Sequence, residues 1–312
     1  MNIKGRIINM TYLLVATACS ASIALIFKYS ERLNTELYVV TSANYFIAFL
    51  TSLIMILYND LFNVARAEVP FLSELRQAFV SENYILSPYG SVLWGISVGI
   101  IAGFFFFLSF IYYQKSVNAN GVSLSGTFAK LGILVPMICS IILWKEMPTP
   151  IQFVGIAFTL AAIIIVNWNP SKDSSKNVNC ILLLLFIFGG MAEFSNKIYQ
   201  KYAINEYKDV FLFTVFFVAF LISVYYIFRN KCRVSIKDII VGFAVGMPNL
   251  FSCYFLILAL DNITASIAFP VYSAGSILLI NIGGAVIFKE KISSKNRFAI
   301  AMIIVALILI NI

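Results

Sequence analysis

Residues Phe128–Glu146 read "FAKLGILVPMICSIILWKE", and residues Tyr272–Glu290 read "YSAGSILLINIGGAVIFKE". The two stretches align without a gap at an offset of 144 residues, and both end in Lys-Glu. The same offset carries Asn167 onto Asn311, so the two alignments finish in register. Landmarks that recur in order at a fixed offset predict an internal repeat.

Two further landmarks support the repeat. The segment "IFKYSERLN" (Ile26–Asn34) matches "SNKIYQKYAIN" (Ser195–Asn205), with Lys28 against Lys197. A Gly-xxx-Gly step in the third predicted helix of each half aligns at an offset of 147, Gly95 and Gly99 with Gly242 and Gly246. The landmarks therefore agree on two copies of one unit.

Apolar side chains dominate the chain, which is 61% hydrophobic and 12% charged and has a mean hydropathy of +0.92. A soluble domain cannot bury that much apolar surface. About 20 apolar residues cross a hydrocarbon core of about 30 Å as a helix, and lipid offers no partners to an open sheet edge. The expected fold is an all-α integral membrane protein with ten transmembrane helices: Met10–Phe27, Leu37–Tyr58, Gly90–Tyr113, Val122–Trp144, Ile151–Trp168, Cys180–Tyr199, Val210–Phe228, Ile239–Leu260, Ala265–Phe288 and Phe298–Ile312.

The spans divide into two predicted five-helix repeats, residues 1–168 and 180–312. The polar, turn-prone stretch at residues 169–179 is the predicted linker. Because each copy has an odd number of spans, the two copies must have opposite orientations in the membrane. Inverted repeats are typical of secondary transporters, in which two halves move about a site near the middle of the bilayer.

Several of these features resemble the drug/metabolite transporter superfamily, in particular its EamA-like branch. They are the five-plus-five spans, the lysines Lys28 and Lys197 that close the first helix of each half, and the segment Lys145–Asn167, in which Lys-Glu precedes a Gly-containing fifth helix. The resemblance implies a central cavity lined by the first, third, fourth, sixth, eighth and ninth helices. It also implies the movement of small metabolites, often by export or exchange.

Lys130 is a charged residue midway along a predicted span. On insertion scales an ionised group in the bilayer core costs roughly 2.5 to 3.5 kcal/mol, so such residues usually face protein or a water-filled cavity. Lys130 is therefore a candidate for contact with an anionic substrate group. A structural salt bridge, with Glu193 as one possible partner, and snorkelling to the membrane edge are the alternatives.

Glu193 lies inside the sixth predicted span, with Asn196, Lys197 and Gln200 at i+3, i+4 and i+7. That spacing places four polar groups on one helix face. Glu193 is expected to exchange a proton or to hold a cationic substrate group, and Asn196 and Lys197 are candidate substrate-binding residues. Alternatively, Glu193 and Lys197 pair at i,i+4 and only fix the helix in place.

The remaining candidate binding residues lie in the eighth and ninth predicted helices. They are Asn249, which follows Pro248, and Tyr254 and Tyr272, whose rings can stack on a substrate or surround a cationic amine. Proline removes a helical hydrogen bond and favours a kink. Interruptions are therefore expected in the fourth, eighth and ninth helices, at Pro136, Pro248 and Pro270.

The sequence argues against an enzyme. It contains no histidine and lacks the H-E-x-x-H and G-x-x-x-x-G-K-[ST] motifs. Its five cysteines have no paired spacing, so no metal site, disulfide framework or cofactor is expected. The net charge of +8 is spread over short connections, which favours lipid headgroups over nucleic acid as partners.

The predicted function is secondary active export or exchange of small polar metabolites such as amino acids, by alternating access. The partners expected are a small-molecule substrate, the lipid bilayer and a coupling proton, with monomer and dimer both open. The cell (inner) membrane is the expected location. A lipid-carrier flippase and a phosphorylated-metabolite or nucleotide-sugar antiporter of the same superfamily are the alternatives. The antiporter is disfavoured because Lys130 aligns with Ala274, which leaves the second half without the matching basic group.

Overall fold

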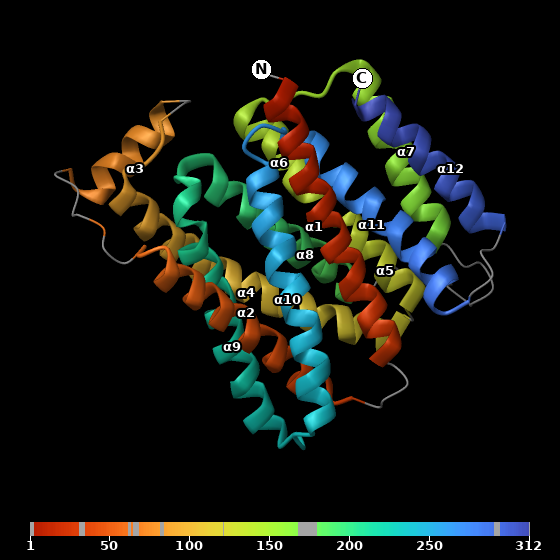
Figure 1. Ribbon diagram of the computed structural model, residues 1–312. Helices are drawn as coiled ribbons and strands as arrows, with labels where there is room; N and C mark the ends of the chain where they lie inside the picture. Colours follow the sequence, from red (N-terminus) through yellow and green to blue (C-terminus); the bar gives the residue numbers. More distant parts are fainter. Residues whose placement is uncertain are drawn as a thin grey trace. The chain divides into compact units, whose positions relative to one another are not determined.

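The computed structural model describes residues 3–30, 35–61, 64, 69–81, 84–120, 122–167, 180–289 and 294–311. Every regular element in these ranges is helical, which confirms the all-α prediction (Figure 1). The predicted linker at residues 169–179 lies outside the described residues.

The helices are α1 (Ile3–Ser30), α2 (Leu37–Tyr58), α3 (Phe71–Val80), α4 (Pro88–Asn120), α5 (Val122–Leu131), α6 (Leu134–Trp144), α7 (Pro150–Asn167), α8 (Cys180–Tyr202), the 3-10 turn η2 (Asn205–Tyr207), α9 (Lys208–Asn230), α10 (Ile236–Ala259), α11 (Ala265–Ile287) and α12 (Ser294–Asn311).

Seven of the helical segments that the structure describes are long and apolar enough to cross a membrane: Ile8–Phe27, Leu37–Tyr58, Pro88–Tyr113, Cys180–Tyr202, Asn205–Asn230, Ile236–Ala259 and Ala265–Ile287. They coincide with seven of the ten predicted spans. The other three predictions fall on shorter apolar helices, Phe128–Trp144, Pro150–Ile165 and Arg297–Ile310.

The chain forms two compact units. Unit 1 combines Met1–Phe107 with Ser195–Asn262, and unit 2 combines Leu108–Phe194 with Ile263–Ile312. Each unit therefore draws helices from both halves of the sequence. The boundaries of the two predicted repeats, residues 1–168 and 180–312, stay a prediction.

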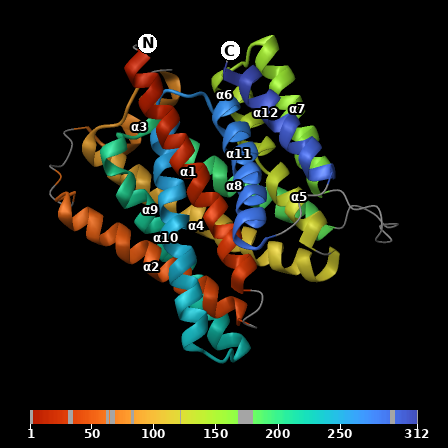
Figure 2. The same ribbon diagram turned by 45° about the vertical axis from the view of Figure 1, so that its right-hand side comes forward.

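In unit 1, α2 packs against both α9 and α10, and α10 also packs along α1 (Figures 1 and 2). Helices α2 and α9 run antiparallel. The ring of Tyr38 stacks on that of Tyr226 with the centroids 6.0 Å apart, and further along α2 Asn59 reaches Asp209 at the start of α9. Aromatic side chains fill the interface between these two contacts.

Glycines allow close helix contacts in unit 1, as expected for membrane helices. A Cβ atom on Gly99 of α4 would lie 2.7 Å from Thr214 Cβ of α9. One on Gly246 of α10 would lie 2.5 Å from the Asn44 carbonyl oxygen of α2. The two predicted Gly-xxx-Gly steps are thus helix-packing surfaces within this unit.

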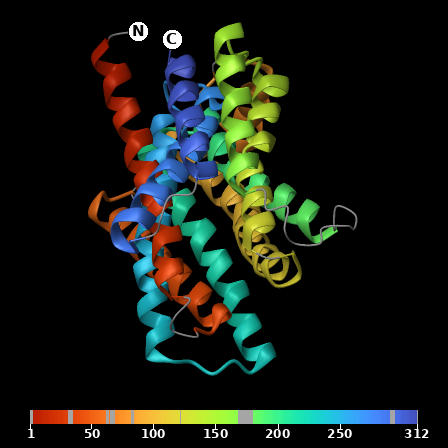
Figure 3. The same cartoon turned by 90° about the vertical axis from the view of Figure 1, so that its right-hand side faces the viewer.

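In unit 2, α7 and α12 pack side by side and antiparallel (Figures 1 and 3). Gln152 Nε2, near the start of α7, donates a hydrogen bond of 3.3 Å to the Ile310 carbonyl oxygen near the end of α12. One turn further along, Gly155 packs on Ala306. Helix α11 contacts α6, α7 and α12.

The fourth predicted span is broken, as expected from Pro136. Helix α5 ends at Leu131 and α6 begins at Leu134. Proline has no N–H to donate to the carbonyl oxygen four residues earlier. That oxygen, on Gly132, instead accepts a hydrogen bond of 3.0 Å from Val135 N.

Helices α10 and α11 continue through Pro248 and Pro270, so neither is divided there as the fourth span is, and the kinks stay a prediction. Transmembrane helices tolerate proline where neighbouring helices and side chains satisfy the freed backbone groups. Pro270 is buried, in a part of α11 where most residues are buried.

Candidate functional site

The charged pair, by which we mean Lys130 and Glu193, lies in unit 2. Lys130 occupies the last turn of α5, and Glu193 lies on α8. Both side chains are half-buried, and the carboxylate of Glu193 is close enough to act electrostatically on Lys130. The structure therefore brings together two predicted site residues that are 63 positions apart in the sequence.

The backbone of unit 2 holds the charged pair in place through two glycines. A Cβ atom on Gly190 of α8 would lie 2.5 Å from the Gly132 carbonyl oxygen and 2.5 Å from Val135 Cβ. Gly132 lies in the break between α5 and α6, two residues after Lys130. The close approach of α8 to this break thus fixes the backbone positions from which the side chains of Lys130 and Glu193 extend.

The polar stripe of α8 continues into unit 1. Asn196 is fully buried and Lys197 is 3% exposed. Lys197 Nζ donates a hydrogen bond of 3.1 Å to Gln200 Oε1, one turn further along the helix. Lys197 is therefore enclosed by protein.

A second group of polar residues lies at one end of unit 1, where α8 and α10 end and α9 begins. We call it the boundary cluster, and its members are Lys197, Gln200, Asn205, Lys208, Tyr254 and Asp261. At its centre, Asp261 Oδ1 accepts a hydrogen bond of 3.1 Å from Gln200 Nε2, and its Oδ2 accepts one from Asn205 Nδ2.

Lys208 connects the boundary cluster to the tyrosine predicted from the sequence. Its ammonium nitrogen lies 4.3 Å from the centroid of the Tyr254 ring and donates a hydrogen bond of 3.2 Å to the Asn205 carbonyl oxygen. A cation over an aromatic face is attracted by the ring quadrupole. The Lys208 side chain is only 8% exposed, so this attraction acts in a largely water-free setting.

The carboxylate of Asp261 is poorly hydrated, although much of the residue's surface is exposed in the turn after α10. Loss of hydration raises the pKa of Asp261 above its ordinary value. Hydrogen bonds from Gln200 and Asn205 and the charges of Lys197 and Lys208 act in the opposite direction without overcoming it. The carboxylate of Asp261 therefore contacts Gln200 and Asn205 in place of water.

The other two predicted residues are engaged in packing. Asn249 Nδ2 of α10 donates a hydrogen bond of 3.2 Å to Asn44 Oδ1 of α2. Tyr272 of α11 is 7% exposed, and its backbone carbonyl oxygen accepts a hydrogen bond from Ser276 Oγ.

The structure thus places Lys130, Glu193 and Tyr272 in unit 2 and the other predicted residues in unit 1. Sequence reasoning missed Lys208 and Asp261. Both lie at helix ends, where charged residues are common, so their positions in the sequence did not indicate a binding site. Gln200, which belongs to the predicted stripe of α8, was the available clue.

Within the described ranges there is no group of three or more His, Cys, Asp or Glu residues that could hold a metal ion. The helices and the buried charges together define the class of the molecule. It is a multi-pass integral membrane protein, all-helical in the residues that the structure describes.

Comparisons with known proteins include a relative by sequence and a neighbour by fold. The chain is 23% identical over 194 residues to an uncharacterized protein of Haemophilus influenzae, a match that covers 61% of this chain and 67% of the relative. It is also similar to a protein of known crystal structure, with a TM-score of 0.68 and 13% identity over 96% of this chain and 95% of the other. At that identity the likeness concerns the fold alone. No protein-family model matches the chain.

Proposed function

We propose that the protein is a secondary active transporter of small polar metabolites, built from two inverted five-helix repeats like those of the drug/metabolite transporter superfamily. The single observation that carries the proposal is the charged pair, which joins a lysine beside a helix break to a glutamate on α8. Ionisable groups inside membrane helices most often serve substrate or ion pathways. A helix break beside them offers backbone groups to a ligand.

The packing of equivalent helices supports the inverted repeat. In the predicted repeat, α2 corresponds to α9 and α7 to α12. Each of these pairs packs antiparallel within its own unit. Two copies related by a two-fold axis in the membrane plane bring equivalent helices together in this way.

Backbone conformation supports the same equivalence. Lys145 and Lys289 are equivalent at the offset of 144, and each follows a helix in the left-handed conformation with φ 54°. Few residues other than glycine adopt positive φ. Among the described residues only four that are not glycine do so, and two of them form this pair.

Within this proposal, Lys130 contacts an anionic group of the substrate and Glu193 carries the coupling proton or a cationic group. For Asn196, Lys197, Asn249, Tyr254 and Tyr272, contact with the substrate stays a prediction from the sequence. Uptake of labelled amino acids and other small polar metabolites into proteoliposomes tests the transport activity. Lys130→Ala and Glu193→Gln should each abolish it, while the exposed controls Lys115→Ala and Glu206→Gln retain it.

A double variant separates function from structure. Removing one partner leaves the other charge uncompensated and lowers stability, whereas removing both restores much of it. The Lys130→Ala/Glu193→Gln protein should therefore unfold at a higher temperature than either single variant and still fail to transport. Transport by the double variant at the wild-type rate would overturn the assignment of the charged pair.

A further inference from the structure

The boundary cluster holds two buried lysines near one carboxylate. Lys197 of α8 is 3% exposed and Lys208 of α9 is 8% exposed. Both charges act on Asp261. Burying an ammonium group is costly unless it is paired and hydrogen-bonded. The shared counter-charge is carried by a turn, whereas both lysines are anchored on helices.

Asp261 is held in the way that a bound carboxylate would be. Each of its two oxygens accepts a hydrogen bond from a different side-chain amide, Gln200 on one side and Asn205 on the other. Hydrogen bonds to an ionised acceptor are stronger than neutral ones and select for a carboxylate's geometry. These donors come from α8 and η2, which are separate elements from the turn that carries Asp261.

The surroundings of Lys208 have unused hydrogen-bonding capacity. An ammonium group has three N–H donors. Among the described residues, Lys208 Nζ makes one hydrogen bond, to the Asn205 carbonyl oxygen. Asn205 Oδ1, three residues before Lys208, and Asp209 Oδ1, on the residue after it, are buried acceptors without a hydrogen-bond partner in the described part of the chain. Each buried acceptor without a donor lowers the stability of the protein by about 1 to 3 kcal/mol. An O–H or N–H group of a ligand that donates to the acceptor would offset this cost.

We propose that the boundary cluster is a binding site for a small carboxylate that carries a hydrogen-bond donor, and that Asp261 occupies this site in the present structure. The ligand's carboxylate takes the place of Asp261 between Gln200 and Asn205, near the charges of Lys197 and Lys208. Its hydroxyl or amino group donates to Asn205 Oδ1 or Asp209 Oδ1. The site differs from the charged pair in location, and its occupation does not depend on transport.

Competition by Asp261 makes a quantitative prediction. A site that is free only part of the time binds with an affinity reduced by the free fraction. Asp261→Asn removes the competing charge and should lower the Kd for the ligand by about tenfold or more. Lys208→Gln removes a cation that faces the ligand and should raise the Kd by a similar factor, whereas Lys208→Arg keeps the charge and should retain binding.

The experiment is isothermal titration of the detergent-purified full chain with three probes. Lactate carries a carboxylate and a hydroxyl donor, propionate lacks the donor, and inorganic phosphate is an anion of another shape. The expected order of affinity is lactate over propionate, with phosphate weakest. Matched controls are Lys237→Gln, which removes an exposed charge at the opposite end of α10, and Asp60→Asn, which removes an exposed carboxylate.

Three results would overturn the proposal. These are absence of lactate binding to Asp261→Asn, binding to Lys208→Gln as tight as to the wild type, and tighter binding of phosphate than of lactate. Variants are compared only if they elute as a single species in size-exclusion chromatography, and Lys208→Arg serves as the folded reference for position 208. Lactate binding without any transport would refute the proposed function alone, and transport without lactate binding would refute this site alone.

Discussion

Replacement by alanine is expected to have opposite effects at two adjacent glycines of α8. A Cβ atom on Gly189 would meet only Ser109 Oγ, at 3.4 Å, which is an ordinary contact. A Cβ atom on Gly190 would lie 2.5 Å from the Gly132 carbonyl oxygen and from Val135 Cβ. Gly189→Ala therefore fits the structure, whereas Gly190→Ala forces α8 away from the break that positions the charged pair.

The expected magnitudes follow from two opposing effects. Replacing glycine by alanine inside a helix stabilises it by about 0.5 to 1 kcal/mol, and this gain applies equally to both positions. Overpacking a close contact costs about 1 to 3 kcal/mol, and only Gly190→Ala incurs it. The free energies of unfolding of the two variants should thus differ by about 1 to 3 kcal/mol, because the helix-propensity gain cancels in the comparison.

Thermal unfolding in detergent at a fixed scan rate provides the assay. At about 2 to 4 °C per kcal/mol for a chain of this size, Gly190→Ala should unfold roughly 2 to 12 °C below Gly189→Ala. In proteoliposomes, Gly190→Ala should also transport more slowly, since Lys130 and Glu193 move apart, and Gly189→Ala should match the wild type. Equal unfolding temperatures for the two variants would refute the claim that backbone contact at Gly132 holds this site together.

Three further predictions concern other contacts. Gly246→Ala places a Cβ atom 2.5 Å from the Asn44 carbonyl oxygen, so it should lower the free energy of unfolding by about 1 to 3 kcal/mol, measured by the same thermal assay. Glu146 Oε2 accepts a hydrogen bond of 2.7 Å from Ala265 N at the start of α11, so Glu146→Gln should cost about 1 kcal/mol, with the exposed Glu206→Gln as a control that changes little. Poor hydration of its carboxylate holds the pKa of Asp261 above its ordinary value of 3.8. Its contribution to stability is therefore fully present below that value and is lost as the pH rises through the raised pKa. As the pH rises from about 4 through the raised pKa, the unfolding temperature of the wild type relative to Asp261→Asn should fall, and a difference that does not change with pH would contradict the raised pKa.

Much of the helical framework could be predicted because apolar length is a local property. Seven predicted spans coincide with long apolar helices. The break in the fourth span was likewise predictable from Pro136, since the missing N–H acts on a residue four positions away. Its location at Gly132, against Gly190 of another helix, was not, because sequence periodicity does not say which helices touch.

The candidate site shows the same limit. Glu193 and Lys197 were found because charge is rare inside an apolar helix. Lys208 and Asp261 were missed because charge is common where helices end, and only folding shows that these ends enclose Lys208 and surround the Asp261 carboxylate. Asn249 was selected because it follows Pro248, yet its amide donates a hydrogen bond to Asn44.

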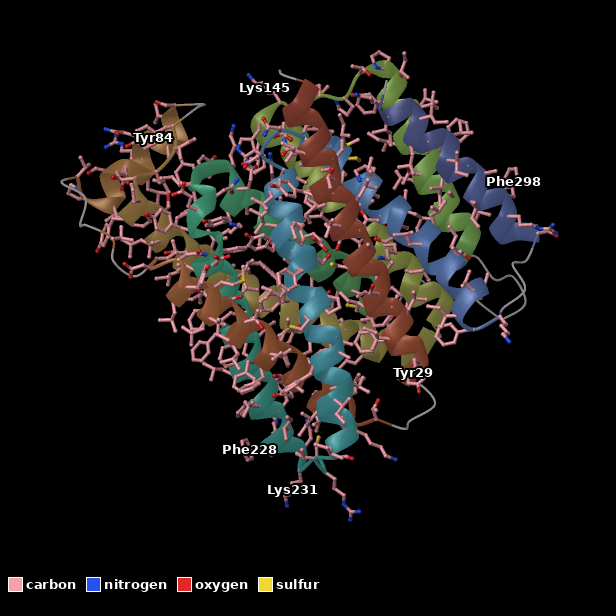
Figure 4. All side chains as sticks on the ribbon, viewed as in Figure 1. Tyr29, Tyr84, Lys145, Phe228, Lys231 and Phe298 are labelled. Carbon is pink, nitrogen blue, oxygen red and sulfur yellow. The ribbon has the colours of Figure 1, made fainter. Side chains whose placement is uncertain are left out.

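The most direct test of the inverted repeat is to measure on which side of the membrane each of two equivalent residues lies. Lys145 and Lys289 are both exposed and share the same φ, so a cysteine at either position meets the same backbone constraint (Figure 4 labels Lys145). Each would be introduced into a variant without the five native cysteines and labelled in oriented vesicles with a membrane-impermeant thiol reagent. Inverted repeats predict that the two cysteines react from opposite sides of the membrane. Labelling of both from the same side would contradict the inverted repeat and, with it, the proposed mechanism of transport.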